Sequence, residues 1–245
     1  MDTLNRKVVK QSNDRLIDCG QFLEHYHYEQ PYFYNLPPPA RRECAPLGKE
    51  HVRRVDNLWS TRQRIRRLIT ANVGKRPPVF LTLTFRQNVR EIREANAIFT
   101  NFIKRLKRYA QCNPRYLTVI EFQKRGSIHY HALFFDLPFV DKNILEQKIW
   151  AHGYTNIQIV KKDLSKIQNL GAYISKYLQK NLIDQRLYKQ KSYFTSRNLI
   201  KPQQFRHAER IDEIIAHAKI TETYRQEIVS LRYGKIIYNQ YKKCD

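Results

Sequence analysis

Two histidines alternate with apolar residues inside one short aromatic run, which extends from Ile128 to Phe135. In a β-strand, the side chains of residues i and i+2 point to the same face of the sheet. A strand here would therefore project His129 and His131 together from one face and send the alternate residues to the other. Two imidazoles fixed on one rigid strand are half of a metal site. The run thus predicts both a strand and a place for chemistry.

The segments around this run alternate between strand and helix patterns. Residues 79–85, 116–122 and 155–160 predict strands, whereas residues 90–110 and 141–152 predict helices. A further helix is expected to end near Lys180. Apart from that helix, the order predicts an α+β fold: a ferredoxin-like or RRM-like split βαββαβ antiparallel sheet with helices on one face, plus N- and C-terminal extensions.

Composition divides the chain into four predicted parts. Residues 1–50 are rich in turn formers and prolines, which predicts an irregular N-terminal arm. Residues 51–75 predict a basic helical segment, and residues 76–205 hold the core patterns. Residues 206–245 predict a C-terminal extension that ends in a hairpin around Gly234.

The charge balance favours a polyanionic partner. The chain has 45 Lys and Arg residues against 22 Asp and Glu residues, which gives a formal net charge of +23. Because such an excess repels itself in a compact state, nucleic acid is the expected partner. No apolar run is long enough to cross a bilayer, and none follows the N-terminus as in a signal peptide. We therefore expect no membrane partner and a location inside the cell.

Several basic residues are candidates for contacts to DNA phosphates. Nothing acidic is interleaved between residues 62 and 75, so the basic helix predicts more than a solvated face. The polar loop at 123–127 adds a second basic pair. The candidates are Arg53, Arg54, Arg62, Arg64, Arg66, Arg67, Lys124 and Arg125.

A carboxylate lies within reach of the paired histidines. Glu121 is near the end of the strand that precedes the turn at 123–127, and a hairpin would bring it beside His129 and His131. Two imidazoles and one carboxylate would leave open positions for water and a phosphate oxygen, which suits Mg²⁺ or Mn²⁺. The alternative is a half-buried His-Tyr-His strand that holds no metal.

A pair of tyrosines supplies candidate nucleophiles. Tyr173 and Tyr177 are four residues apart and would share one helix face, and each is followed three residues later by a lysine, Lys176 and Lys180. A nearby ammonium favours the phenolate, which is the nucleophilic form of tyrosine. The alternative is a pair of stacked core tyrosines.

These motifs, in this order, resemble those of the HUH endonucleases, in particular bacterial plasmid and phage rolling-circle replication initiators. Residues 80–85 look like the first motif of the family, His129-Tyr130-His131 looks like the His-hydrophobe-His motif, and residues 173–177 look like the two-tyrosine motif. Residues 194–202 resemble a stretch downstream of the tyrosines. The resemblance covers residues 60–205, and Glu121 stands where several members supply a third metal ligand.

The resemblance implies a nickase and strand transferase. One tyrosine would attack a phosphate at a single-stranded origin site or extruded hairpin, forming a 5′-phosphotyrosine and a free 3′-hydroxyl that primes replication. The second tyrosine would accept the strand at termination and allow religation. The chain has no GxxxxGK[ST] loop, so a host helicase and polymerase in a bacterial cytoplasm are expected partners.

Other functions remain open from the sequence. A single-strand transposase or a conjugative relaxase would use the same chemistry. A non-catalytic nucleic-acid-binding protein with an RNA-recognition-like sheet would share the βαββαβ order, although no aromatic RNP-type motif is evident. A basic structural protein would bind nucleic acid without forming a covalent adduct.

Overall fold

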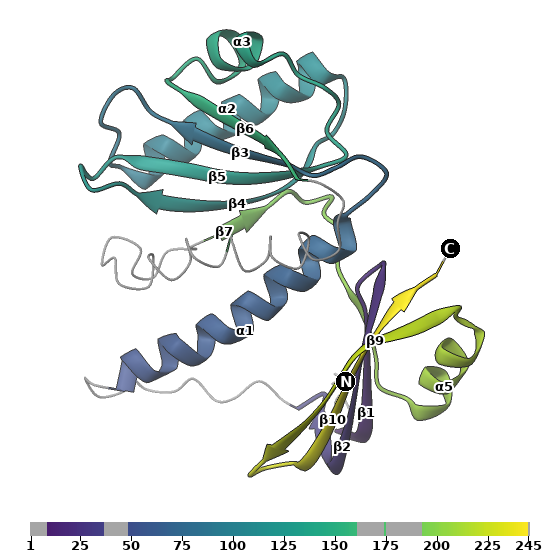
Figure 1. Ribbon diagram of the computed structural model, residues 1–245. Helices are drawn as coiled ribbons and strands as arrows, with labels where there is room; N and C mark the ends of the chain where they lie inside the picture. Colours follow the sequence, from purple (N-terminus) through teal and green to yellow (C-terminus); the bar gives the residue numbers. More distant parts are fainter. Residues whose placement is uncertain (1–8, 37–48, 161–173, 175–192, 245) are drawn as a thin grey trace, which may run out of the picture. The chain divides into compact units, whose positions relative to one another are not determined.

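The computed structural model describes residues 9–36, 49–160, 174 and 193–244, and the side chains of residues 49–59 lie outside that description. The chain forms two compact units (Figure 1). One unit contains residues 52–200, and the other combines residues 1–51 with residues 201–245. The candidate site residues from Arg53 to Lys180 all belong to the first unit.

The unit of residues 52–200 contains a five-stranded antiparallel sheet in the order β6-β3-β5-β4-β7. Its strands are β3 (Val79–Thr84), β4 (Arg115–Phe122), β5 (Ile128–Phe135), β6 (Thr155–Ile159) and β7 (Tyr193–Thr195). Helix α2 (Ile92–Ala110) connects β3 to β4, and a short helical segment connects β5 to β6. The chain order and the sheet order confirm the predicted α+β split βαββαβ arrangement.

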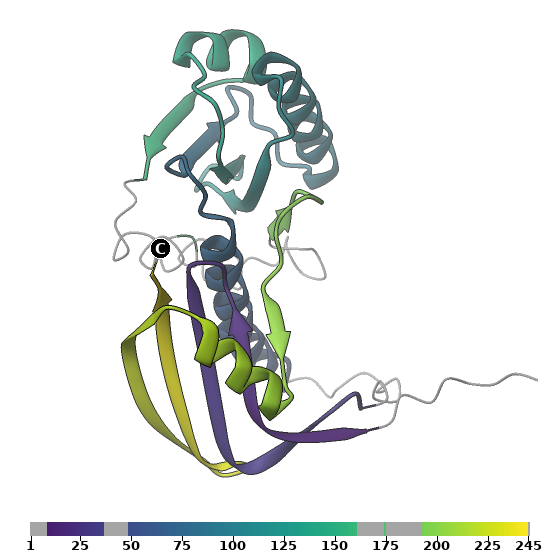
Figure 2. The same cartoon turned by 90° about the vertical axis from the view of Figure 1, so that its right-hand side faces the viewer.

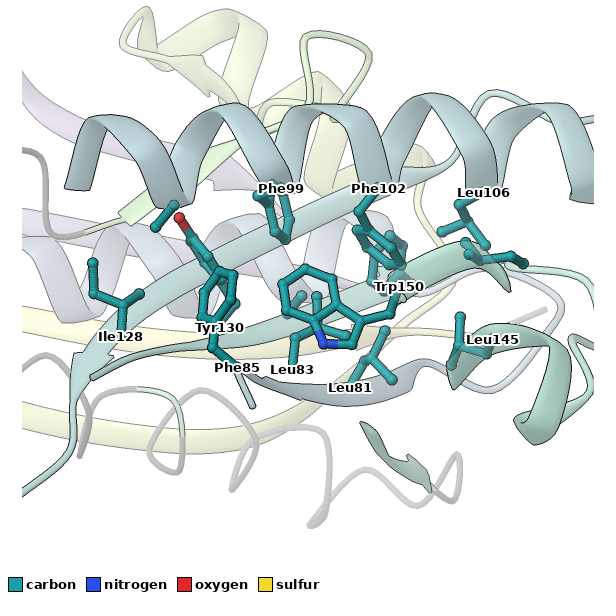
Figure 3. Packing of buried hydrophobic residues seen from close by; sticks show 14 of the residues in the cluster. Leu81, Leu83, Phe85, Phe99, Phe102, Leu106, Ile128, Tyr130, Leu145 and Trp150 are labelled. Atoms are coloured by element: carbon teal, nitrogen blue, oxygen red, sulfur yellow. The ribbon is translucent and has the colours of Figure 1, made fainter. Parts of the chain in front are cut away.

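Helix α2 covers one face of this sheet. Its apolar residues recur at helical spacing, so Ala95, Phe99, Phe102 and Leu106 form one buried stripe. This stripe packs against alternate residues of β3 and β5 and against Trp150, which is fully buried (Figure 3). The same face receives every second residue of β5, namely Ile128, Tyr130, Ala132 and Phe134.

A second helix packs on the opposite face, where the sequence predicts no cover. Helix α1 (Lys49–Asn72) contributes Ile65, Leu68 and Ile69 to a second apolar cluster. The sheet contributes Phe80, Leu117, Val119, Leu133 and Phe135 to that cluster. Figure 1 shows α1 and α2 on opposite sides of the sheet. The expectation of helices on one face therefore holds for the βαββαβ core, and α1 adds a layer beyond it.

The segment between β5 and β6 begins as predicted but ends differently. The Asp141 carboxylate accepts hydrogen bonds from the backbone N–H groups of Asn143 and Ile144, which caps α3 (Lys142–Ile144). The chain continues as a π-helix, η1 (Leu145–Trp150). Ala151, with a φ of 61°, ends the helix in the left-handed conformation. The sequence favours Gly153 for that role, but Gly153 instead leaves room for the close approach of the Thr84 carbonyl.

The other unit contains a second antiparallel sheet, in the order β8-β1-β2-β10-β9. Its strands are β1 (Lys10–Asp18), β2 (Phe22–Tyr34), β8 (Gln203–Phe205), β9 (Ile220–Ser230) and β10 (Gly234–Lys243). Helix α5 (Ala208–His217) lies against this sheet, where Ile211 packs on Leu16 and Leu23 (Figure 2). The predicted terminal hairpin around Gly234 is confirmed.

The prediction of an irregular arm is wrong for residues 10–34, which form two of the longest strands of this sheet. Strand β2 pairs with β10 through Tyr26↔Tyr238 and neighbouring residues, far away in the sequence. Such a non-local pairing leaves no periodic signal within β1, whose sequence is mostly polar. The structure divides the chain after residues 51 and 200, rather than at the predicted boundaries.

Candidate functional site

The candidate site occupies the face of the sheet that carries α1, at the end of β5 where that strand begins. His129 and His131 project from β5 on this face, because the residues between and beside them fill the α2 face. The antiparallel register places Glu121 of β4 directly opposite His129. On the other side of β5, Thr82 and Thr84 of β3 stand opposite His131 and His129. The structure therefore brings together the three predicted metal ligands.

His131 is held on several sides. Its Nε2 atom is 2.6 Å from Oε2 of Glu121, and its Nδ1 atom is 3.2 Å from the Thr82 hydroxyl. The Phe80 ring stacks on the imidazole with 5.9 Å between ring centroids. Both members of the Glu121–His131 pair are largely buried, at 14% and 6% side-chain exposure. Contacts of this kind fix the orientation of an imidazole.

His129 is buried with an unsatisfied nitrogen. Its Nε2 atom is inaccessible to solvent and has no hydrogen-bond partner among the described residues. Burial, together with the neighbouring His131 ring and the Arg125 charge, lowers the pKa of His129 to about 4 against the opposing effect of Glu121. The ring is therefore neutral at physiological pH. A neutral imidazole with a free nitrogen is the form that binds metals.

The donor set fits a divalent cation, whereas the present side-chain arrangement does not yet form a cage. Within the described ranges, no group of three or more His, Cys, Asp or Glu side chains is arranged to hold a metal ion. The reason is that His131 and Glu121 are hydrogen-bonded to each other, while the two histidine rings lie 6.3 Å apart between centroids. The unsatisfied Nε2 atom of His129 beside this pair is the observation that favours a missing ligand.

Thr82 is a site residue that sequence reasoning missed. The alternation within β3 assigns Thr82 to the face opposite Leu81 and Leu83, which are buried against α2. That alternation is readable from the sequence. The contact with His131 depends on the pairing of β3 with β5, which the sequence does not provide.

The predicted catalytic residues Tyr173, Tyr177, Lys176 and Lys180 lie outside the described residues. Ile174, however, is described: it is helical, fully buried and part of the apolar cluster that contains Val119 and Leu133. Those two residues lie on the same face of β4 and β5 as Glu121 and the histidines. The chain segment that carries the tyrosines is thus joined to the face that carries the histidines.

The predicted DNA-binding residues fall on two separate elements. Lys124 and Arg125 are exposed in the turn between β4 and β5, directly beside the metal candidates. Arg62, Arg66 and Arg67 are half-buried on α1, and Arg64 is exposed there. The side chains of Arg53 and Arg54 belong to the part of α1 that is not described.

Comparisons with known proteins bear on the same segment. A family model for replication-associated proteins of the ORF2 type matches residues 78–182, which include β3 to β6 and all three metal candidates. This similarity supports a replication-associated protein that interacts with DNA. No curated protein matches the chain. None of the helices in the described ranges has the length and hydropathy needed to span a membrane.

Among solved structures, the chain is similar to the hypothetical protein ORF119 from Sulfolobus islandicus rod-shaped virus 1, known from a crystal structure. The two sequences are 20% identical, and the TM-score is 0.36. The alignment covers 47% of this chain and 92% of the viral protein.

Proposed function

We propose that this chain is a metal-dependent DNA endonuclease and strand transferase that nicks and rejoins single-stranded origin DNA during rolling-circle replication. The observation that carries the proposal is the assembly of Glu121, His129 and His131 on one sheet face. Two further findings support it. Ile174, which follows Tyr173 in the sequence, is buried on that face, and the matched family is one of replication-associated proteins.

Glu121, His129 and His131 would hold the divalent cation, Mg²⁺ or Mn²⁺. When bound, such a cation polarises a phosphate and stabilises the charge that develops on it. His129 offers its neutral, unsatisfied Nε2 atom. The Thr82 hydroxyl orients the His131 ring through Nδ1 and leaves Nε2 for the ligand role.

The nucleophile would be Tyr173 or Tyr177. Its phenolic oxygen forms a bond to the phosphorus atom, and the bond from phosphorus to the 3′-oxygen breaks. The 3′-oxygen leaves as a hydroxyl after taking up a proton, which balances the proton lost by the phenol. Lys176 and Lys180 would favour the phenolate by their positive charge. The second tyrosine would accept the displaced strand at termination and allow religation.

The proposed substrate is a single-stranded origin site or an extruded origin hairpin. A phosphodiester must enter the face that carries His129, and a base-paired duplex does not present its backbone to a buried pair of imidazoles. Because the sequence has no nucleotide-dependent motor motif, a host helicase would open the duplex and a host polymerase would extend the 3′-hydroxyl. These partners correspond to the cytoplasm of a bacterial host.

The test is a cleavage assay on labelled single-stranded oligonucleotides from the flanking replicon, with Mn²⁺ or with chelator. We expect a metal-dependent nick with protein attached to the 5′ end, visible on a denaturing gel. The nick should vanish in His129→Ala and in the Tyr173→Phe/Tyr177→Phe double variant, and the two single tyrosine variants identify which residue acts first. Tyr154→Phe, an exposed tyrosine of the same unit, is the matched control and should retain activity.

The contrary outcome is equally clear. If origin DNA is bound tightly but is never cut or linked to the protein under any metal, the endonuclease proposal is wrong. The chain would then be a basic binding module built on the same sheet.

A further inference from the structure

A large cavity lies beside the candidate metal site, between the start of α2 and the turn that joins β4 to β5. Its volume is about 1090 Å³. Four of its lining side chains are basic, namely Arg90, Arg93, Lys124 and Arg125, and one, Glu91, is acidic. Ligand cavities in proteins commonly measure a few hundred to about 1,000 Å³. The cavity is therefore large enough for a nucleotide.

The cavity has a preformed wall. The Arg125 carbonyl accepts hydrogen bonds from Nη2 of Arg90 at 3.2 Å and from Nδ2 of Asn88 at 3.4 Å. The backbone N–H of Ile128 donates to the Val89 carbonyl at 2.9 Å. Nη2 of Arg125 donates to the Phe85 carbonyl at 2.7 Å. These bonds tie residues 85–90 to the turn, so the wall does not have to be ordered when a ligand binds.

The basic side chains keep donors for a ligand. Arg93 and Lys124 are exposed, and neither makes a hydrogen bond or an ion pair within the described part of the chain. Arg90 uses one nitrogen on the Arg125 carbonyl and retains the others. Four cations around one cavity, opposed by Glu91 alone, select an anion, and guanidinium groups match the oxygens of a phosphate.

The cavity also has an apolar side and an amide. Phe122 and Ile92 line it, which suits contact with a base or a deoxyribose. The Tyr130 hydroxyl, whose residue is fully buried, donates to Oδ1 of Asn96 at 2.8 Å. This bond fixes the Asn96 amide and leaves its Nδ2 hydrogens for an acceptor in the cavity. A ligand with a phosphate, a sugar and a base would use all three kinds of lining group.

The cavity is joined to the candidate metal site through the chain itself. Phe122 follows Glu121 on β4, and adjacent residues of a strand point to opposite faces. Arg125 lines the cavity, and its charge is also felt at His129 on the other face of the hairpin. A single strand that leaves the histidine face around this turn would reach the cavity next.

We propose that this cavity binds a nucleotide of single-stranded DNA that flanks the cleaved phosphate, with its phosphate on Arg93 and Lys124. The proposal rests on the proposed function, because it takes single-stranded DNA as the substrate. It adds a second anchoring point that fixes the register of the strand at the metal site.

The experiment measures equilibrium binding of a short fluorescein-labelled oligothymidylate by fluorescence anisotropy, in chelator so that no cleavage occurs. The test variant is Arg93→Ala/Lys124→Ala. The matched control is Lys104→Ala/Arg108→Ala, which removes two exposed cations from the same helix α2 away from the cavity. We expect the test variant to bind at least about tenfold more weakly and the control to stay within about threefold of the unaltered protein.

The salt dependence separates a contact from a general field. For single strands, each lost phosphate contact lowers the slope of log affinity against log salt by about 0.7. The test variant should therefore lose about 1.4 in slope, and the control should keep its slope. An oligonucleotide with abasic residues should bind the unaltered protein more weakly if the apolar side of the cavity holds a base.

Two outcomes overturn the proposal or its basis separately. Equal losses of affinity and of slope in both double variants mean that the cavity is not a site and that the charge acts collectively. A protein that never nicks DNA but shows the expected difference between the two double variants has lost the proposed function and kept the strand-binding cavity.

Discussion

On the α2 face of the five-stranded sheet, β5 contributes Ile128, Tyr130, Ala132 and Phe134 to a continuous apolar layer. On the opposite face the same strand begins with His129 and His131 and continues with Leu133 and Phe135. One face is uniform along its length, whereas the other is polar at one end and apolar at the other. The apolar end packs on α1 and Ile174, and the polar end holds the candidate metal ligands.

The difference shows where the fold can accept an unfavourable group. A buried imidazole nitrogen without a hydrogen bond costs free energy. The α2 face stabilises the sheet through large buried rings, including Phe99, Phe102 and Trp150. That stabilisation allows the opposite face to keep the unsatisfied His129 in place. Variants on the two faces should accordingly differ in kind: loss of folding from one, loss of ligand binding from the other.

The largest expected effect is on the α2 face. Trp150→Ala should lower the free energy of unfolding by about 3–5 kcal/mol, because a fully buried indole leaves a cavity and its Nε1 hydrogen bond to the Thr84 carbonyl is lost. Urea unfolding followed by circular dichroism measures the change. Phe139→Ala, at a residue that is 88% exposed, is the control and should change stability by less than about 0.5 kcal/mol. Similar losses in both variants would contradict the assignment of the core.

The next effect is a pH dependence on the histidine face. The pKa of His129 is lowered from 6.5 to about 4 by burial and by its charged neighbours, so the folded state binds this proton less readily than the unfolded chain. Stability from this group is complete above about pH 6.5 and falls as the pH drops towards about 4. The loss should reach about 2–3 kcal/mol in metal-free protein.

The measurement for His129 compares urea unfolding of the unaltered protein and of His129→Leu at neutral and at acidic pH, both in chelator. The leucine variant should lose less stability between the two pH values. Parallel losses would mean that His129 is already charged or solvated in the folded state.

A smaller effect concerns the carboxylate of the histidine face. Glu121→Gln keeps the size of the side chain and removes its charge, so Mn²⁺ affinity should fall at least about tenfold, which is about 1.4 kcal/mol. Titration calorimetry with MnCl₂ measures this. Glu94→Gln, an exposed residue on α2, controls for net charge. Equal affinity in the Glu121 variant and in the unaltered protein would remove Glu121 from the ligand set.

The smallest effect tests a polar atom within the uniform face. Tyr130→Phe removes the hydroxyl that donates to Asn96, so stability should fall by about 1 kcal/mol. Tyr116→Phe is the comparison, because no hydrogen bond of its hydroxyl occurs within the described part of the chain, and it should cost less. A larger loss from Tyr116→Phe would reverse this assignment. Thermal unfolding of both variants under identical buffer is sufficient.

Local patterns in the sequence predicted most of the unit that carries the site. The alternation in residues 128–135 predicted β5 and the common face of His129 and His131, and helical spacing predicted α2. The short turn at 123–127 predicted that Glu121 meets His129, and the register confirms it. Each of these features depends on residues that are close in the sequence.

The features that the sequence did not predict depend on distant pairings. Strands β1 and β2 are completed by β8 and β10, so their stability comes from residues that are about two hundred positions away in the chain. Thr82 becomes a partner of His131 only because β3 pairs with β5. The cavity beside the turn arises from the approach of residues 85–90 to that turn, which no periodic pattern announces.

The register of β5 has a consequence for how this chain can change over generations. A shift of β5 by one residue would turn both imidazoles into the layer beneath α2 and bring Tyr130 and Phe134 out to the opposite face. A lineage that gains or loses one residue in the preceding turn therefore fails at folding before its chemistry is ever tested. Selection for a folded chain protects the phase of the histidines, even in a host where the reaction is not needed.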